Sequence, residues 1–145
     1  MARNTSVTHK IMSAIPQKNT KPEMLLRRSL WQAGMRYRVN YRRLPGKPDI
    51  VFTRTKIAIF VDGDFWHGHN WAVRGLNSLD EELSKYSDFW KTKIRGNIAR
   101  DATINEELSN AGWKVIRIWE SDLYKNVDQY RDAIIEAHKA RIMVR

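Results

Sequence analysis

The stretch Leu44–His69 reads LPGKPDIVFTRTKIAIFVDGDFWHGH, and it decides more of the fold than any other part of the chain. A Pro-Gly turn leads into an apolar run that begins at Asp49, and after a polar connection a second apolar run ends at Asp62. Because both runs are rich in β-branched residues, they predict two paired central strands, at 49–52 and 57–61. We therefore expect the two carboxylates to face each other across a few ångströms, a geometry suited to a divalent cation with oxygen ligands.

Two histidines, His67 and His69, follow the second carboxylate of this stretch. An imidazole has an ordinary pKa near neutrality and can act as a general base, while a divalent cation can activate a water molecule. Carboxylates followed by imidazoles therefore predict metal-assisted chemistry.

The segments on either side of this stretch alternate between helical and extended patterns. Thr20 can cap a helix in which Glu23 stands three residues later, and Gly34 ends that helix. Further patterns predict a strand at 36–41, a loop at 63–79, a helix at about 80–110 with a break near residue 87 left open, a strand at 113–119 and a helix at about 127–141. The order α-β-β-β-α-β-α predicts an α/β fold in which helices flank a mixed central sheet. We expect a basic N-terminal arm at 1–19 and a single domain at 20–145.

Basic residues are concentrated in the first part of the chain. The whole chain carries 26 Lys and Arg against 16 Asp and Glu, a net charge of +10. Residues 1–56 hold 13 basic and two acidic residues, so this segment alone carries +11 and the remainder carries −1. Such an asymmetry favours a polyanion as partner, most commonly nucleic acid. The alternative is a solvated basic surface that keeps a small protein in solution.

Composition and length exclude several classes of protein. The chain has 145 residues, enough for a real core, and it has no cysteine, so it forms neither a disulfide nor a thiolate metal site. No apolar run approaches the length of a membrane span, and the N-terminus lacks the apolar core of a signal peptide. We expect a monomer in the cytoplasm that binds duplex DNA and no membrane.

Six features occur along the chain in the order found in one nuclease family. They are the segment Met12–Ile15, the acid Glu23, and the segments Leu44–Asp49, Phe60–His67, Phe89–Asp101 and Gly112–Glu120. Together they resemble the very-short-patch-repair (Vsr) mismatch endonucleases, and the element order resembles the PD-(D/E)XK, or restriction-endonuclease-like, nuclease core. The resemblance covers residues 12–120, and its most specific part is Phe-Trp-His followed by Asn-x3-Asp.

The resemblance implies an endonuclease that hydrolyses a phosphodiester bond in duplex DNA with Mg²⁺, for which Mn²⁺ can substitute. It implies Asp49 as the principal metal ligand beside the carbonyl of Val61. It implies His67 as the general base and Asp101 as the carboxylate that orients it. Asp62 stands where the family has a histidine next to the metal, and it could add a ligand or make the site more demanding of its cation.

Two further residues take roles through the same resemblance. It implies that Glu23 holds metal-bound water and that Asn97 supports the site. Each assigned residue also has a plain structural alternative, such as a capping acid for Glu23, a solvated helix acid for Asp101 or a stacked ring for His67.

The zinc site of the family is where this chain departs most from it. The family binds a structural zinc through cysteine and histidine, whereas this chain has Asp64, Trp71 and Ser121 at the cysteine positions and keeps only His69. A structural zinc site needs a closed set of ligands, so we expect no zinc and expect the packing of Trp71 to replace it. The loop at 68–84 also differs, so mismatch recognition does not follow from the resemblance.

Six residues are candidates for DNA contacts. The aromatic residues match the wedge that the family inserts into the base stack, and the basic residues lie in the +11 segment just before Asp49: Phe65, Trp66, Trp90, Arg42, Arg43 and Lys47. The alternative for Trp90 is a place in the core.

Three functions remain open at this point. The first is a strand-nicking mismatch repair endonuclease, and the second is a homing or restriction-type nuclease of the same fold that cuts matched DNA. The third is an inactive DNA-binding module, which the retention of the metal and base residues argues against.

Overall fold

The computed structural model describes residues 18–143, so most of the predicted N-terminal arm lies outside the described residues. The elements are α2 (Lys21–Gln32), β1 (Arg38–Val39), β2 (Ile50–Phe52), β3 (Ile57–Asp62), α3 (Asn70–Val73), α4 (Leu79–Leu83), α5 (Asp88–Asn110), β4 (Lys114–Trp119) and α6 (Glu120–Met143). Every helix in this part of the chain is too short or too polar to cross a lipid bilayer.

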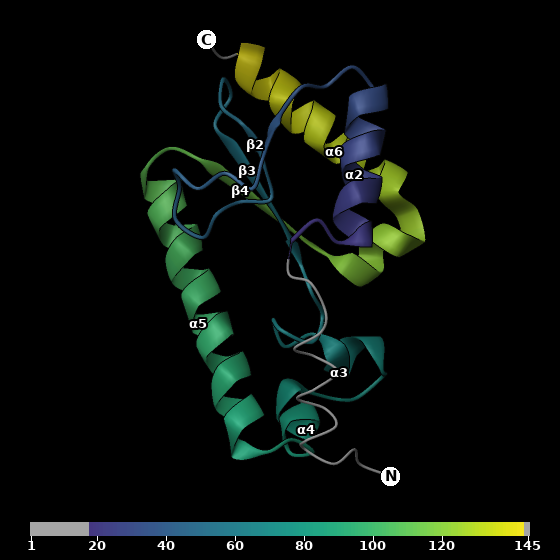
Figure 1. Ribbon diagram of the computed structural model, residues 1–145, viewed down its shortest axis with the longest axis vertical. Coiled ribbons are helices and arrows are strands. Elements are labelled where there is room, and N and C mark those ends of the chain that lie inside the picture. The colour runs from purple at the N-terminus through teal and green to yellow at the C-terminus, as the bar shows by residue number, and fades with distance from the viewer. Residues whose placement is uncertain (1–17, 144–145) are drawn as a thin grey trace.

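The four strands form one mixed sheet in the order β1-β2-β3-β4. β2 pairs antiparallel with β1 and with β3, while β4 runs parallel to β3. The long helix α5 lies along one face of the sheet, and α2 and α6 lie together on the other face (Figure 1). The prediction of a mixed sheet flanked by helices is confirmed.

Side-chain alternation along β3 separates two hydrophobic cores. Ile57 and Ile59 pack on the face that α2 and α6 cover, whereas Ala58 and Phe60 pack toward Leu108 of α5. This alternation matters for the site, because Asp62 has the same parity as Phe60 and so projects toward α5.

The start of α2 follows the predicted capping pattern. The Thr20 side chain accepts a hydrogen bond from the Glu23 amide at 3.5 Å, and a proline stands in the first turn of the helix. The cap fixes the buried Glu23 in the first turn of α2.

Several predicted boundaries are wrong. The predicted loop at 63–79 contains the short helix α3, and the predicted strand at 36–41 is reduced to the two residues of β1. Asn40 adopts a positive φ of 46°, which takes the backbone out of the extended region and ends the strand. An additional helical segment at 120–125 was not predicted, but the non-helical φ and ψ of Asn126 separate it from the last helix, so the predicted start near Val127 is confirmed. The break near residue 87 is present, because α4 and α5 are separate helices.

Candidate active site

Asp49 lies at the start of β2 with its carboxylate held by the backbone of β3. Its Oδ2 accepts a hydrogen bond of 2.7 Å from the amide of Val61. Burial raises the pKa of Asp49 to about 7, and the nearby charges of Glu23 and Asp62 add to this effect while the amide opposes it. Like charges around a half-buried carboxylate are relieved by a cation, so the donor set fits a divalent ion at this position.

Glu23 is almost fully buried behind Asp49, with 1% of the residue exposed. It accepts a hydrogen bond from the Asn19 amide at 3.0 Å and forms an ion pair of 3.1 Å with Arg27. Burial raises the pKa of Glu23 despite these partners and despite a hydrogen bond with Asp49. Glu23 thus interacts with Asp49 in addition to standing in the first turn of α2, and its role toward a metal stays a prediction.

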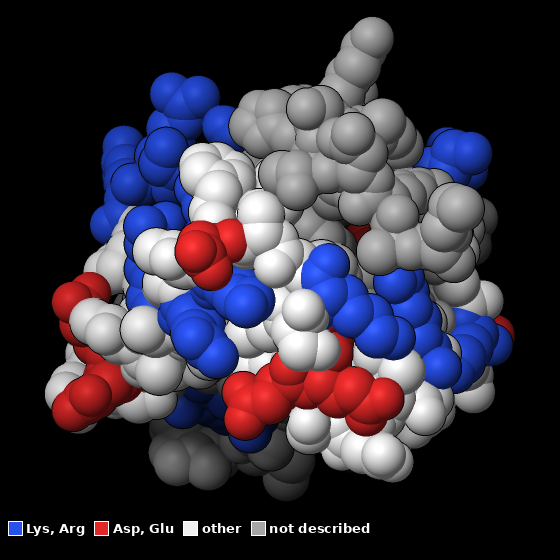
Figure 2. Space-filling model, turned by 90° about the horizontal axis from the view of Figure 1, so that it is seen from below, with Lys and Arg blue, Asp and Glu red and all other residues white. Residues whose placement is uncertain are grey.

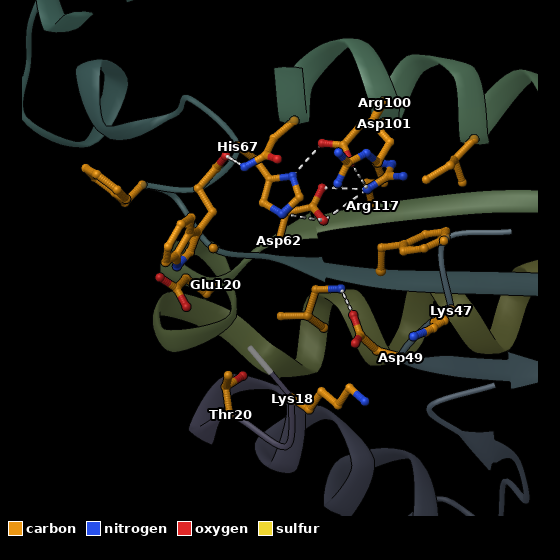
Figure 3. Close-up of a pocket in the computed structure, with 18 of the residues that line it drawn as sticks. Lys18, Thr20, Lys47, Asp49, Asp62, His67, Arg100, Asp101, Arg117 and Glu120 are labelled. Atoms are coloured by element: carbon orange, nitrogen blue, oxygen red, sulfur yellow. Dashed lines mark hydrogen bonds and ion pairs between the residues drawn. The ribbon is translucent and has the colours of Figure 1, made fainter. Parts of the chain in front are cut away.

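The expectation that Asp49 and Asp62 face each other is wrong. The side chain of Asp62 lies on the same side of β3 as those of His67 and Arg117, while Asp49 lies on the other side (Figure 3). Side chains alternate between the two faces of a strand. Val61 packs on the face that α2 and α6 cover, so the side chain of Asp62 points to the opposite face, while Asp49 is bound by the backbone amide of Val61. The two carboxylates still influence each other, since Asp62 contributes to the raised pKa of Asp49.

His67 forms a carboxylate–imidazole pair with Asp101 of α5. Its Nδ1 donates to Asp101, and its Nε2 lies 3.7 Å from Oδ1 of Asp62. Burial lowers the pKa of His67, but the hydrogen bond to Asp101 and the charge of Asp62 outweigh burial, so the pKa is raised above its ordinary value. A ring fixed at Nδ1 presents Nε2 as the nitrogen that can take a proton.

Asn97 supports the loop that carries the histidine. Its side-chain amide donates a hydrogen bond of 3.0 Å to the carbonyl of Trp66, and it stands one helical turn before Asp101 on α5. The helix thus positions both the ring and the preceding backbone.

Arg117 is a site residue that sequence reasoning missed. It lies on β4 opposite Phe60 of the parallel partner strand, and its Nη1 donates to both carboxylate oxygens of Asp62 at 3.0 and 3.2 Å. Its Nη1 also lies 3.5 Å from Oδ1 of Asp101. The sequence signal was one arginine between the apolar residues of 115–119, and it becomes informative only when the register with β3 is known.

Apart from Glu23, these residues line a cavity of about 510 Å³. Of the predicted DNA-contacting residues, four line it: Arg42, Lys47, Phe65 and Trp66. Further lining residues that the sequence reasoning missed are Lys18, Lys93, Arg100 and Glu120, and Figure 3 shows three of these around the proposed metal and base residues. The cavity therefore combines acidic, imidazole and basic groups.

A tight turn presents Lys47 to this cavity. Gly46 has a φ of 77°, and a Cβ at this position would lie 2.8 Å from the side chain of Ile104 on α5. Only glycine combines this backbone conformation with so close an approach, so the Pro-Gly turn predicted to precede Asp49 also places a cation next to it.

The end of the molecule formed by α4 and the first turns of α5 is mixed in charge. Figure 2 shows a red group there with blue side chains beside it. Arg95 pairs with Asp80 at 3.6 Å, and Lys91 lies 4.0 Å from Asp88, so these cations are partly neutralised. Within the described part of the chain, no such ion pair involves the cavity residue Arg100, which remains available to an anion.

The predicted aromatic wedge forms a cluster at the edge of the cavity. Phe65 and Trp90 are buried, and Trp66 packs partly buried against both, with ring centroids 5.2 to 5.6 Å apart. The core alternative for Trp90 thus describes its place in the free protein. The neighbouring Phe89 is the more exposed ring, with 56% of the residue accessible. Insertion of these rings into DNA stays a prediction.

A hydrogen-bonded group stands where the family has its zinc site. Asp64 accepts from Nδ1 of His69 at 2.6 Å, and from the amide and hydroxyl of Ser121 at 3.2 and 2.9 Å. The ring of His69 stacks on Trp119 at 4.0 Å between centroids with an interplanar angle of 1°. Trp71 is half-buried in the short helix α3, and the expectation that its packing replaces the metal stays a prediction.

Comparison with known proteins places the chain in a family. The model of the family described as DNA mismatch endonuclease Vsr matches residues 4–73. A type II nicking enzyme of Haemophilus parainfluenzae is 44% identical over 113 residues, which cover 78% of this chain and 77% of the relative. This chain belongs to the Vsr family.

Two other relatives give the same result. A type II nicking enzyme of Neisseria meningitidis is 42% identical over 117 residues, which cover 81% of this chain and 76% of the relative. The DNA mismatch endonuclease Vsr of Escherichia coli is 34% identical over 114 residues, or 79% of this chain and 69% of that enzyme. The Vsr resemblance of the sequence motifs is thus confirmed, and the mixed α/β architecture is consistent with a nuclease-like fold.

Proposed function

We propose that this Vsr-family protein is an endonuclease that nicks one strand of duplex DNA, using a restriction-endonuclease-like core and a divalent ion, Mg²⁺ or Mn²⁺. The observation that carries the proposal is the His67–Asp101 pair in the same cavity as Asp49 and a set of basic side chains. A phosphodiester needs cations to bind its phosphates and a base to activate water, and the cavity provides both kinds of group.

The carboxylate of Asp49 and the carbonyl of Val61 would hold the ion, with Glu23 behind them to hold its water molecules. The bound ion would neutralise charge on the scissile phosphate and lower the pKa of a water molecule. Burial and neighbouring acids raise the pKa of Asp49 to about 7, and a cation held there would favour the deprotonated carboxylate.

His67 takes the proton of the attacking water at Nε2. Asp101 keeps the proton on Nδ1, so the ring presents its other nitrogen as the acceptor and is stabilised once it becomes charged. Because the pKa of His67 is raised, the ring is a stronger base than a free imidazole, although it is also protonated over more of the acidic range.

Basic residues around the cavity bind the phosphates on either side of the cleaved bond. Arg42 and Lys47 come from the segment before Asp49, and Arg100 comes from α5, so the cavity is basic on two sides. Arg43 is exposed next to Arg42 and would contact the backbone outside the cavity. The aromatic cluster of Phe65, Trp66 and Trp90 would enter the duplex at the site of a mismatch.

A nicking assay tests the proposal. Supercoiled and linear duplexes of randomised sequence, with and without a base mismatch, are incubated with the parent protein and Mg²⁺, and the Asp49→Ala variant is compared at equal folded concentration. We expect a nick in the mismatched duplex that Asp49→Ala does not produce. Equal cleavage of matched duplexes would instead identify a restriction-type nuclease, and binding without any cleavage would identify an inactive DNA-binding module.

A further inference from the structure

Carboxylates lie on both sides of β3, with Asp49 on one side and Asp62 and Asp101 on the other. The two sides differ in whether a basic side chain forms an ion pair with these carboxylates. Asp49 is held by a backbone amide, and within the described residues no Lys or Arg forms an ion pair with it. Asp62 and Asp101 share a guanidinium instead, because Nη1 of Arg117 lies 3.0 and 3.5 Å from their respective oxygens. Among the described residues Asp49 itself has no ion-pair partner, because Arg27 pairs with Glu23, whereas Asp62 and Asp101 already share one.

The position of Arg117 is fixed from several sides. Its Nε donates to the side-chain oxygen of Asn105 at 2.7 Å, and its guanidinium carbon lies 4.1 Å above the ring of Phe60. Phe60 and Arg117 are register partners on adjacent parallel strands, and Asn105 stands one helical turn after Asp101 on α5. A planar group with this many partners is preorganised rather than a mobile side chain that could move aside.

The arrangement conflicts with a metal ion at Asp62. Ligand atoms of Asp62, His67 and Asp101 lie within 4.8 Å of one another, so by distance alone they could hold an ion. Both oxygens of Asp62, however, accept hydrogen bonds from Arg117. A divalent ion at that point would meet a permanent positive charge at a few ångströms in a half-buried site, where charge repulsion is strong. The hydrogen bonds to both oxygens therefore disfavour an ion there.

We propose that Arg117 is the built-in cation of the Asp62–His67–Asp101 group, so that the protein binds a single divalent ion, at Asp49, and none at Asp62. The guanidinium neutralises the two carboxylates and holds them against His67, which makes Arg117 a positioning residue for the base. The inference rests on the proposed function only for the role of the ion in catalysis.

Counting bound Mn²⁺ by electron paramagnetic resonance on the full metal-free chain tests the inference. We expect one ion in the parent and none in Asp49→Asn. In Arg117→Met, which removes the charge and keeps an apolar stem, we expect a second ion, which the added change Asp62→Asn removes again. Arg117→Lys keeps the charge and should stay at one ion. Arg100→Met is the matched control, since Arg100 lines the same cavity without an ion pair, and it should also stay at one.

Three outcomes would overturn the inference: two ions in the parent, loss of the ion in Asp62→Asn, or a folded Arg117→Met variant that still binds only one. Circular dichroism and thermal unfolding establish which variants are folded. If Arg117→Met does not fold, Asp62→Asn decides, because one ion supports the inference and none refutes it. A parent that nicks DNA and binds two ions refutes this inference alone, whereas a parent that binds one ion and does not nick refutes the proposed function alone.

Discussion

This protein has two aspartate–histidine pairs whose histidines are only two residues apart in the sequence. The two pairs lie in different surroundings. His67 is bound at Nδ1 by Asp101, and its Nε2 reaches the cavity beside Asp62. His69 is bound at Nδ1 by Asp64, but its ring is covered by Trp119 and its carboxylate partner is bound to Ser121. An aspartate–histidine pair can act as a base only where the second ring nitrogen is accessible to a substrate. Elsewhere the same pair only stabilises the fold.

The largest expected difference between the pairs is in activity. His67→Gln should lower the nicking rate by about 100-fold to 10,000-fold, the usual worth of a general base, and leave the affinity for DNA unchanged. His69→Gln is the matched control and should keep most of the activity of its folded fraction. Single-turnover nicking rates and DNA binding measured on both variants decide this. Equal reductions in the two variants would contradict the assignment of His67 as the base.

For stability, we expect the pair of Asp64 and His69 to matter more than the pair of His67 and Asp101. Asp64→Ala removes hydrogen bonds to His69 and to both groups of Ser121, and it should lower the free energy of unfolding by about 1–3 kcal/mol. Asp101→Ala should cost less, because 21% of the Asp101 side chain is exposed against 8% for Asp64. Urea unfolding of both variants measures the difference. A larger destabilisation by Asp101→Ala would show that the two pairs have been assigned the wrong way round.

The pH dependence of nicking sharpens the role of the first pair. The base must be neutral, and the pKa of His67 is raised, so the rate should fall as the pH drops through a value above the ordinary 6.5. Asp101→Asn removes the carboxylate charge that raises this pKa and leaves at most a neutral, weaker hydrogen bond, so the acid limb should move to lower pH. Rate profiles across the neutral range at saturating metal report the shift. An unmoved limb would point to Asp49 as the titrating group.

DNA affinity separates the base from the binding surface. Arg42→Ala with Arg43→Ala should weaken binding and lower the log–log salt slope by about one to two, since each phosphate that the protein neutralises releases roughly one counterion. Lys91→Ala with Arg95→Ala is the matched control, because those two cations already pair with acids of the protein. Salt titrations of binding compare the two double variants. Equal slopes would mean that the first pair of arginines only solvates the surface.

The smallest expected effect concerns zinc. Because Asp64, His69 and Ser121 satisfy one another, we predict that the purified protein contains no stoichiometric zinc and that added Zn²⁺ leaves the unfolding temperature unchanged. Elemental analysis and thermal unfolding check this. One tightly held zinc per chain would mean that the second pair is a metal site after all.

The sequence by itself determined the local features of this protein. The cap at Thr20 and the strands on either side of the polar connection follow from short-range patterns that depend on neighbouring residues alone. The Vsr motifs also predicted that His67 and Asp101 act together, and the structure places them in contact.

Contacts between distant segments were decided only by the tertiary structure. Whether Asp62 faces Asp49 or Arg117 depends on side-chain parity along β3 and on the parallel register of β4, which local patterns do not encode. Asp64 binds Ser121, which lies 57 positions further along the chain. The hydrogen-bonded group of Asp64, His69 and Ser121 can therefore be recognised only from the position of α6 next to the loop. Hydrogen bonds of this kind depend on where whole elements meet, because a polar side chain has many potential partners until packing selects one.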